Sequence, residues 1–292
     1  MFAPASPIYI ESAMLADAAF GACPGRAAAE LPVAAHPLDS WYRAVILGGQ
    51  GRYAAAREEL HRLRASNPDP VLLSLAASTE GSLLRQLGWH ARAATFDGRA
   101  AALVLPIGSG DRADPIGPDR TAAVCDALTG LAADALGTGR LALATRLLRR
   151  SHAAMTRAGS PAGWRSLIRW HWVCAETALA SGAADAATPH AETALALAAA
   201  GPSVRHRVKS RLLLAATAAA SGDNDRALRL ADEVAEQCRE HGLLPLRWAS
   251  SMLRAGVSVG ARATEATTDA QRCAARITRR GGHFRPMSDS QL

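Results

Sequence analysis

A short frame of small residues recurs five times along this 292-residue sequence and constrains its fold more than any other feature. In each copy a glycine is followed five positions later by an alanine and preceded seven positions earlier by an alanine or a glycine. The copies are Ala44/Gly51/Ala56, Gly81/Gly88/Ala93, Ala132/Gly139/Ala144, Ala175/Gly182/Ala187 and Ala215/Gly222/Ala227. Small residues allow two helices to approach closely, and a glycine readily ends one helix before the next begins. The frame therefore predicts a series of antiparallel helix pairs.

The composition favours helices over strands. Hydrophobic residues make up 49% of the chain but aromatic residues only 4%, so alanine, the best helix former, supplies much of the apolar character. No segment shows the alternation that is typical of strands. The net charge of +7 is a weak argument for an acidic partner, whether protein, nucleic acid or lipid surface.

The sequence also suggests a cellular location. The five cysteines never form a CxxC pair, which argues against a zinc site or a disulfide framework and favours a reducing compartment. The first residues lack the basic stretch of a signal peptide, and no apolar run is long enough to span a membrane. We therefore expect a cytoplasmic protein without a membrane partner.

Proline- and glycine-rich breaks predict three regions. Residues 1–37 are expected to form a loosely ordered N-terminal extension, residues 38–258 the helical array, and residues 259–292 a polar, basic and largely disordered tail. The longest proline- and glycine-rich insertion within the array, Pro106–Pro118, is expected to form a mobile loop.

The frame resembles that of the tetratricopeptide-type repeat proteins. With Gly51 in the fifteenth place of a repeat, Ala44 falls in the eighth, Ala56 in the twentieth and Pro68 in the thirty-second. The resemblance covers about Leu38 to His241 and implies an all-α, right-handed α-solenoid of about five antiparallel helix pairs plus a closing helix. The segments SLLRQLGWHARAATFDGRA and SVRHRVKSRLLLAA also resemble uncharacterised helical-repeat proteins of actinobacteria, which implies no activity.

The resemblance also implies which residues face a partner. In that family the first helix of each pair lines the concave face, and places two, five, nine, twelve and thirteen point into the groove. The residues placed there or beside it are Ser78, Ser82, Arg85, Gln86, Arg169, Trp172, Glu176, Arg205 and Lys209. Arginine and tryptophan are good anchors for a peptide with acidic and apolar groups. The alternative is that Trp170 and Trp172 belong to the core and that the arginines are simply solvated.

No motif predicts catalysis. The segment Val45–Ala55 imitates a dinucleotide-binding turn, but no second strand ending in an acidic residue follows it. Glu58 and His61 have the spacing of a di-iron ligand pair, but the second pair that such a site needs is missing. We therefore expect neither an enzyme nor a cofactor or metal.

Three hypotheses for function remain. The first is a non-enzymatic adaptor, scaffold or regulatory subunit that binds a partner segment in its concave groove. The second is a regulatory protein that associates with nucleic acid through the basic segments Arg205–Arg211 and Arg279–Arg285. The third, an all-helical enzyme or small-molecule binder, requires a closed polar pocket.

Overall fold

The computed structural model of the chain describes residues 7–66, 69–106, 119–157 and 163–286. Within them the chain is all-helical, with no strand. The elements are α1 (Pro7–Phe20), η1 (Ala28–Glu30), α2 (Pro37–Gly49), α3 (Tyr53–Ser66), α4 (Pro70–Arg85), α5 (His90–Val104), α6 (Arg120–Gly137), α7 (Leu141–Arg157), α8 (Trp164–Ala180), α9 (Ala184–Ala200), α10 (Val204–Ala220), α11 (Asn224–Glu240), α12 (Leu244–Val257) and α13 (Gly260–Arg279). None of these described helices is both long and apolar enough to cross a membrane. Apart from Pro106, the loop expected at 106–118 lies outside the described residues.

The recurring frame marks the corner of each helix pair. Its five central glycines all have positive φ, from 71° to 83°, a backbone conformation that residues with a Cβ rarely adopt. At Gly88, the backbone N–H of Trp89 donates to the carbonyl of Leu84 at 3.0 Å, which closes the end of α4 and turns the chain toward α5. The alanine five positions after each central glycine is fully buried where the two helices touch.

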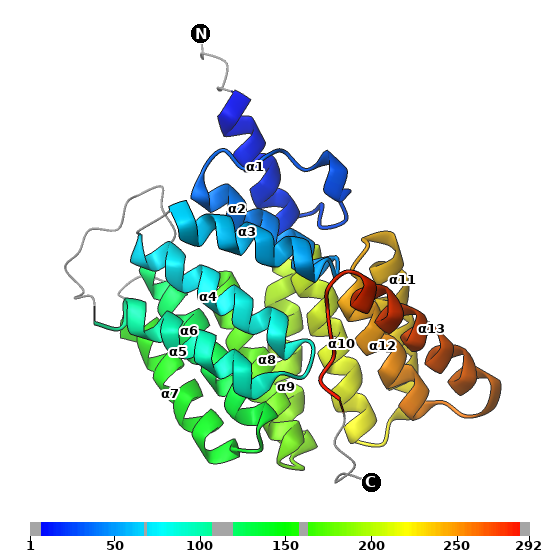
Figure 1. Cartoon of the computed structure of the whole chain (residues 1–292). Coiled ribbons are helices and arrows are strands. Elements are labelled where there is room, and N and C mark those ends of the chain that lie inside the picture. The colour runs from blue at the N-terminus through cyan, green and yellow to red at the C-terminus, as the bar shows by residue number, and fades with distance from the viewer. Residues whose placement is uncertain (1–6, 67–68, 107–118, 158–162, 287–292) are drawn as a thin grey trace.

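Six helix pairs pack one after another in the described part of the chain, from α2–α3 to α12–α13 (Figure 1). This packing confirms the predicted α-solenoid. The prediction of a single closing helix followed by a largely disordered tail is wrong, because α13 packs along α12 as a sixth pair. Although α13 is polar overall, its apolar residues recur at helical spacing on one buried face, which consists of Ala266, Ala270, Cys273 and Ile277.

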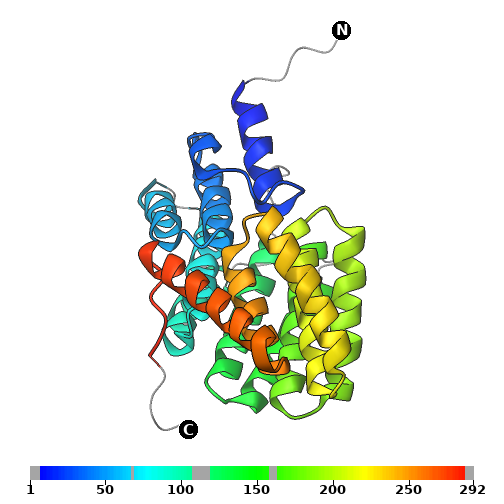
Figure 2. The same ribbon diagram turned by 90° about the vertical axis from the view of Figure 1, so that its right-hand side faces the viewer.

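The segment after α13 returns to the beginning of the array, and we call residues 280–286 the closing strap. The carbonyl of Arg280 accepts from the N–H of Ala54 at 2.9 Å, and its guanidinium donates to the carbonyl of Gln50 at 2.9 Å. Farther along, the indole N–H of Trp89 donates to the carbonyl of His283 at 2.7 Å. Figures 1 and 2 show the red end of the chain beside the blue and cyan helices of the first pairs. The solenoid therefore closes on itself.

The N-terminal extension is also packed where the structure describes it. Helix α1 lies on α2 and reaches α10, and the N–H of Val204 donates to the carbonyl of Gly21 at 3.1 Å. Leu15, Ala18 and Ala19 are buried on one face of α1. The expectation of a loosely ordered extension is therefore wrong for this part of it, because residues three and four positions apart form a continuous apolar stripe.

Candidate ligand-binding cavity

The first helices of the six pairs surround a central cavity of about 500 Å³. Its wall comes from the end of α2 and from α4, α6, α8, α10 and α12, together with His90 at the start of α5. Stacked helix pairs curve around a concave side, and here the curvature encloses a space. The predicted groove residues that line this cavity are Ser82, Arg85, Gln86, Arg169, Trp172, Glu176, Arg205 and Lys209. The remaining one, Ser78, lines a smaller neighbouring cavity.

Arg85 is held in the cavity wall by two carboxylates. Its Nη1 forms ion pairs with Asp97 and, at 3.0 Å, with Asp134. Asp97 lies between Gly81 and Gly130, where an added Cβ on either glycine would overlap its carboxylate. Burial and the charge of Asp134 raise the pKa of Asp97 to about 7, although Arg85 acts in the opposite direction. Arg85 was predicted to bind a ligand, but its charge is compensated by these two carboxylates, and the ion pairs join α4 to α5 and α6.

Trp172 forms an aromatic part of the wall. Its indole N–H donates to Ser210 Oγ at 2.8 Å, and its ring stacks on that of His206, with centroids 5.2 Å apart. Lys209 Nζ lies 5.8 Å from the Trp172 ring centroid and 2.7 Å from Glu176 Oε1, so these two charges compensate each other.

Trp170, two residues earlier, has the core role that the alternative interpretation gave to both tryptophans. It packs against the main hydrophobic cluster, and its indole N–H donates to the carbonyl of Leu148 at 2.9 Å. Because successive helix positions are 100° apart, Trp170 and Trp172 face different surroundings.

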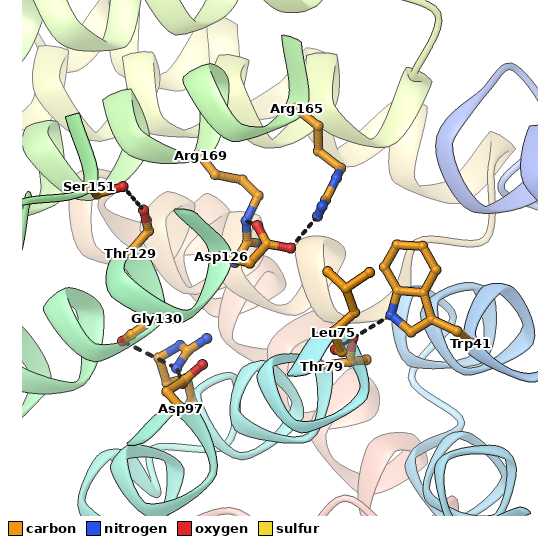
Figure 3. A network of polar contacts seen from close by, with 11 residues as sticks. Trp41, Leu75, Thr79, Asp97, Asp126, Thr129, Gly130, Ser151, Arg165 and Arg169 are labelled. Carbon is orange, nitrogen blue, oxygen red and sulfur yellow. Dashed lines mark hydrogen bonds and ion pairs between the residues drawn. The ribbon is translucent and has the colours of Figure 1, made fainter. Parts of the chain in front are cut away.

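Three arginines, Arg165, Arg169 and Arg205, form what we call the arginine cluster. Asp126 lies between the first two: its Oδ2 is 2.7 Å from Arg165 Nη1 and its Oδ1 accepts from Arg169 Nε at 3.1 Å (Figure 3). Arg205 Nη1 donates to the carbonyl of Val45 at 3.1 Å. Among the described residues, no carboxylate lies within ion-pair distance of Arg205.

The electrostatics of this region reflect an excess of positive charge. Burial, followed by the charges of Arg169 and Arg165, lowers the pKa of Arg205 to about 10. Burial and the same cluster lower the pKa of His206 well below its usual value, so its ring is neutral near pH 7. One carboxylate among three half-buried guanidinium groups leaves this part of the wall cationic.

Further hydrogen bonds hold the inner helices in place. The indole N–H of Trp41 on α2 donates to Thr79 Oγ1 on α4 at 3.0 Å, and the hydroxyls of Thr129 and Ser151 are 3.1 Å apart between α6 and α7 (Figure 3). Such buried polar contacts fix the relative positions of the helices that carry the wall.

Helix α6 contributes wall residues that were not predicted, although the sequence contains a signal for them. Applying the same five places to the unit of Gly139 marks residues that all line one of the two cavities: Asp126, Thr129, Ala133, Leu136 and Gly137. The wall residues of α12, among them Leu246 and Trp248, have no comparable signal, because that helix lacks the frame.

The basic segment Arg205–Arg211 is divided among different environments. Arg205 and Lys209 face the cavity, while Arg211 Nε is 3.2 Å from Glu233 Oε2. In the tail, Arg280 is bonded to the carbonyl of Gln50. These cations therefore do not form one continuous surface for phosphates. In the part of the chain that the structure describes, no group of three or more His, Cys, Asp or Glu side chains could hold a metal ion.

Comparison of the sequence with protein-family models and with curated proteins found no match. Among solved structures, the chain is similar to a Rap protein crystallised in complex with Competence and Sporulation Factor. The TM-score is 0.63 and the sequence identity 10%, and the alignment covers 96% of this chain and 78% of the Rap chain. At this identity the likeness supports the fold, a tetratricopeptide-like α-solenoid.

Proposed function

We propose that this chain is a non-enzymatic recognition module that binds a short peptide, or a short segment of another protein, in its central cavity. The observation that carries the proposal is the convergence of charged and aromatic side chains from α4, α8 and α10 on one cavity. In the similar structure the Rap protein is complexed with a factor, which supports partner binding as a use of this fold. An adaptor or regulatory subunit is the role that suits such an array.

The size of the cavity limits its occupant. About 500 Å³ lies within the range of roughly 300–1,000 Å³ that ligand pockets span, and it accommodates only a few residues. The closing strap joins the first and last pairs, so the cavity is not an open groove that could accept a long helix. A small organic acid is the second candidate, because a cavity of this volume also suits a small molecule.

The chemistry of the wall defines the partner further. Trp172, Val173, Leu246 and Trp248 provide apolar surface, and Arg205, which has no carboxylate within ion-pair distance among the described residues, provides positive charge. Aromatic and arginine side chains dominate the affinity of most recognition sites. The partner therefore carries both an apolar side chain and an acidic group. The nucleic-acid alternative receives less support, because Arg205 and Lys209 face the interior.

Filling the cavity tests this proposal. Ala133 on α6 lines the cavity, and Ala142 on α7 is exposed, so Ala133→Phe and Ala142→Phe are a matched pair. Wild type and both variants would be immobilised and offered a randomised pentapeptide pool, and the retained peptides identified by mass spectrometry. We expect retention by wild type and by Ala142→Phe, and its loss in Ala133→Phe with an unchanged helical circular dichroism spectrum. Equal retention by all three proteins, or by none, would refute the proposed function.

A further inference from the structure

The smaller cavity, about 60 Å³, adjoins the central one, and we call it the narrow end. The two share part of their wall, including Ser82, Arg169, Arg205 and His206. Phe20, at the end of α1, lies over this end, with its ring 5.3 Å from that of Trp41. The guanidinium carbon of Arg165 is 5.3 Å from the Phe20 ring centroid, so this cation is covered by an aromatic side chain.

The narrow end contains polar groups that have few or no partners within the described chain. Ser78 is 4% exposed, and its hydroxyl has no hydrogen-bond partner there. Arg205 is half-buried and forms one hydrogen bond with the described residues, to the carbonyl of Val45, although a guanidinium has five N–H donors. Buried polar groups are normally satisfied, and buried charges are normally paired. A ligand group that accepts hydrogen bonds and carries negative charge would meet both requirements.

The charge balance specifies that group. Asp126 already bonds to Arg165 and Arg169, so the arginine cluster retains two positive charges after this pairing, counting three guanidinium groups against one carboxylate. The available guanidinium is that of Arg205, and a planar guanidinium matches a planar carboxylate through two parallel hydrogen bonds.

We infer that the narrow end is a carboxylate subsite, in which Arg205 binds the carboxylate of the ligand and Ser78 donates a hydrogen bond to it. This inference rests on the proposed function and gives the occupant a direction. The C-terminus of a peptide enters first, and its apolar side chains lie in the larger cavity against Trp172 and Trp248. A small organic acid offers the same carboxylate, so the two sources share one recognition chemistry.

The subsite can be tested without a peptide. The Nε–H signal of Arg205 in a ¹H–¹⁵N spectrum of the full chain can be assigned from its loss in Arg205→Gln. Titration with sodium acetate should shift this signal saturably, while sodium chloride at equal ionic strength should not. An Arg205 signal that acetate leaves unmoved would overturn the subsite. A larger response to inorganic phosphate than to acetate would overturn its assignment to carboxylates.

Peptide pools then separate the subsite from the function as a whole. Three pentapeptide pools would be compared: one without acidic residues and with a free C-terminus, the same pool amidated, and an amidated pool with one Asp or Glu. We expect at least tenfold greater retention of the free-carboxylate pool than of its amidated form, the ratio that a charge-assisted hydrogen bond supplies. The ratio should fall to about one in Arg205→Gln and persist in the control Arg207→Gln. In Arg205→Lys it should be smaller than in wild type, because an ammonium group cannot form the two parallel hydrogen bonds.

The outcomes differ for the two proposals. Retention of the amidated acidic pool as well would support a carboxylate subsite that also accepts side chains. Equal retention of the free and amidated acid-free pools, abolished by Ala133→Phe, would overturn the subsite and leave the proposed function standing. If wild type retains no pool, the proposed function fails, and saturable binding of acetate at Arg205 would then identify a small organic acid as the ligand.

Discussion

Replacing Gly130 with alanine tests how tightly the inner helices are packed around Asp97. A Cβ at position 130 would lie 2.3 Å from Asp97 Oδ1 and 2.5 Å from its Cγ. Asp97 cannot move away from Gly130, because the backbone of α4 lies directly on its other side. A Cβ added there, at Gly81, would be only 2.4 Å from Asp97 Oδ2. The carboxylate is fully buried and bonded to Arg85. The variant must therefore displace either a helix or this ion pair.

The magnitude follows from three contributions. Alanine in a helix interior is more favourable than glycine by about 0.5–1 kcal/mol. Overpacking a close-packed site costs about 1–3 kcal/mol, and weakening a hydrogen bond to a charged group costs about 1.5–3 kcal/mol. The net expectation is a loss of about 2–5 kcal/mol in the free energy of unfolding. At ~2 °C per kcal/mol for a chain of this length, the melting temperature falls by about 4–10 °C.

Thermal unfolding followed by circular dichroism at 222 nm measures this change. Gly98→Ala is the matched control: it lies in α5 beside Asp97, and an added Cβ there has no atom within 4 Å, so we expect a melting temperature raised by about 1–2 °C. In an Asp97→Ala background, Gly130→Ala should cost little, because the clashing carboxylate is gone. A Gly130→Ala variant at least as stable as wild type would refute the packing described here.

Three further predictions concern the histidine pair, a corner glycine and the closing strap. His171 Nδ1 and His190 Nδ1 are 2.9 Å apart, and burial followed by the charge of His190 lowers the pKa of His171 to about 4. Protonation therefore favours the unfolded chain as the pH falls from about 6.5 to about 4. Between pH 7 and pH 4.5 the melting temperature of His171→Gln should fall less than that of wild type. A Cβ added at Gly182 would have no atom within 4 Å, so the strain in Gly182→Ala comes from its φ of +73° alone. The free energy of unfolding, measured by urea denaturation, should fall by about 1–2 kcal/mol, and an unchanged free energy would contradict this strain. Truncation after Arg279 removes the closing strap and should speed hydrogen exchange at the start of α3 and at the α4–α5 corner, whereas unchanged protection would show that the strap does not close the solenoid.

Helix boundaries and helix faces could be predicted because their causes are local. A positive φ at Gly88 or Gly139 depends on the backbone of a single residue, and glycine is the residue that adopts it readily. Burial of Ala93 or Ala144 follows from a spacing that places it on the contact face. The resemblance to tetratricopeptide-type repeats predicted that Trp172 lies on the inner face, and it lines the cavity.

The roles of individual charges could not be predicted in this way. Nothing in the sequence near Arg85 shows that Asp97 and Asp134, from two later helices, take up its charge. Arg169 and Arg205 carry the same side chain at similar inner positions, yet the first is paired with Asp126 and the second has no carboxylate partner among the described residues. Pairing depends on distances between helices, which a repeat frame does not contain.

By itself, the sequence therefore determined an all-helical chain of stacked pairs, and the resemblance to tetratricopeptide-type repeats indicated which faces of α4, α8 and α10 turn toward the centre. Only the tertiary structure decided that α13 completes a sixth pair, that residues 280–286 return to α3, and that the concave side forms one cavity with an excess of positive charge. The physical reason is one of range. Backbone conformation and helical periodicity act over a few residues. The curvature that brings the last helix pair back to the first is the sum of small rotations between successive pairs, and these rotations also decide which charged side chains come close enough to pair.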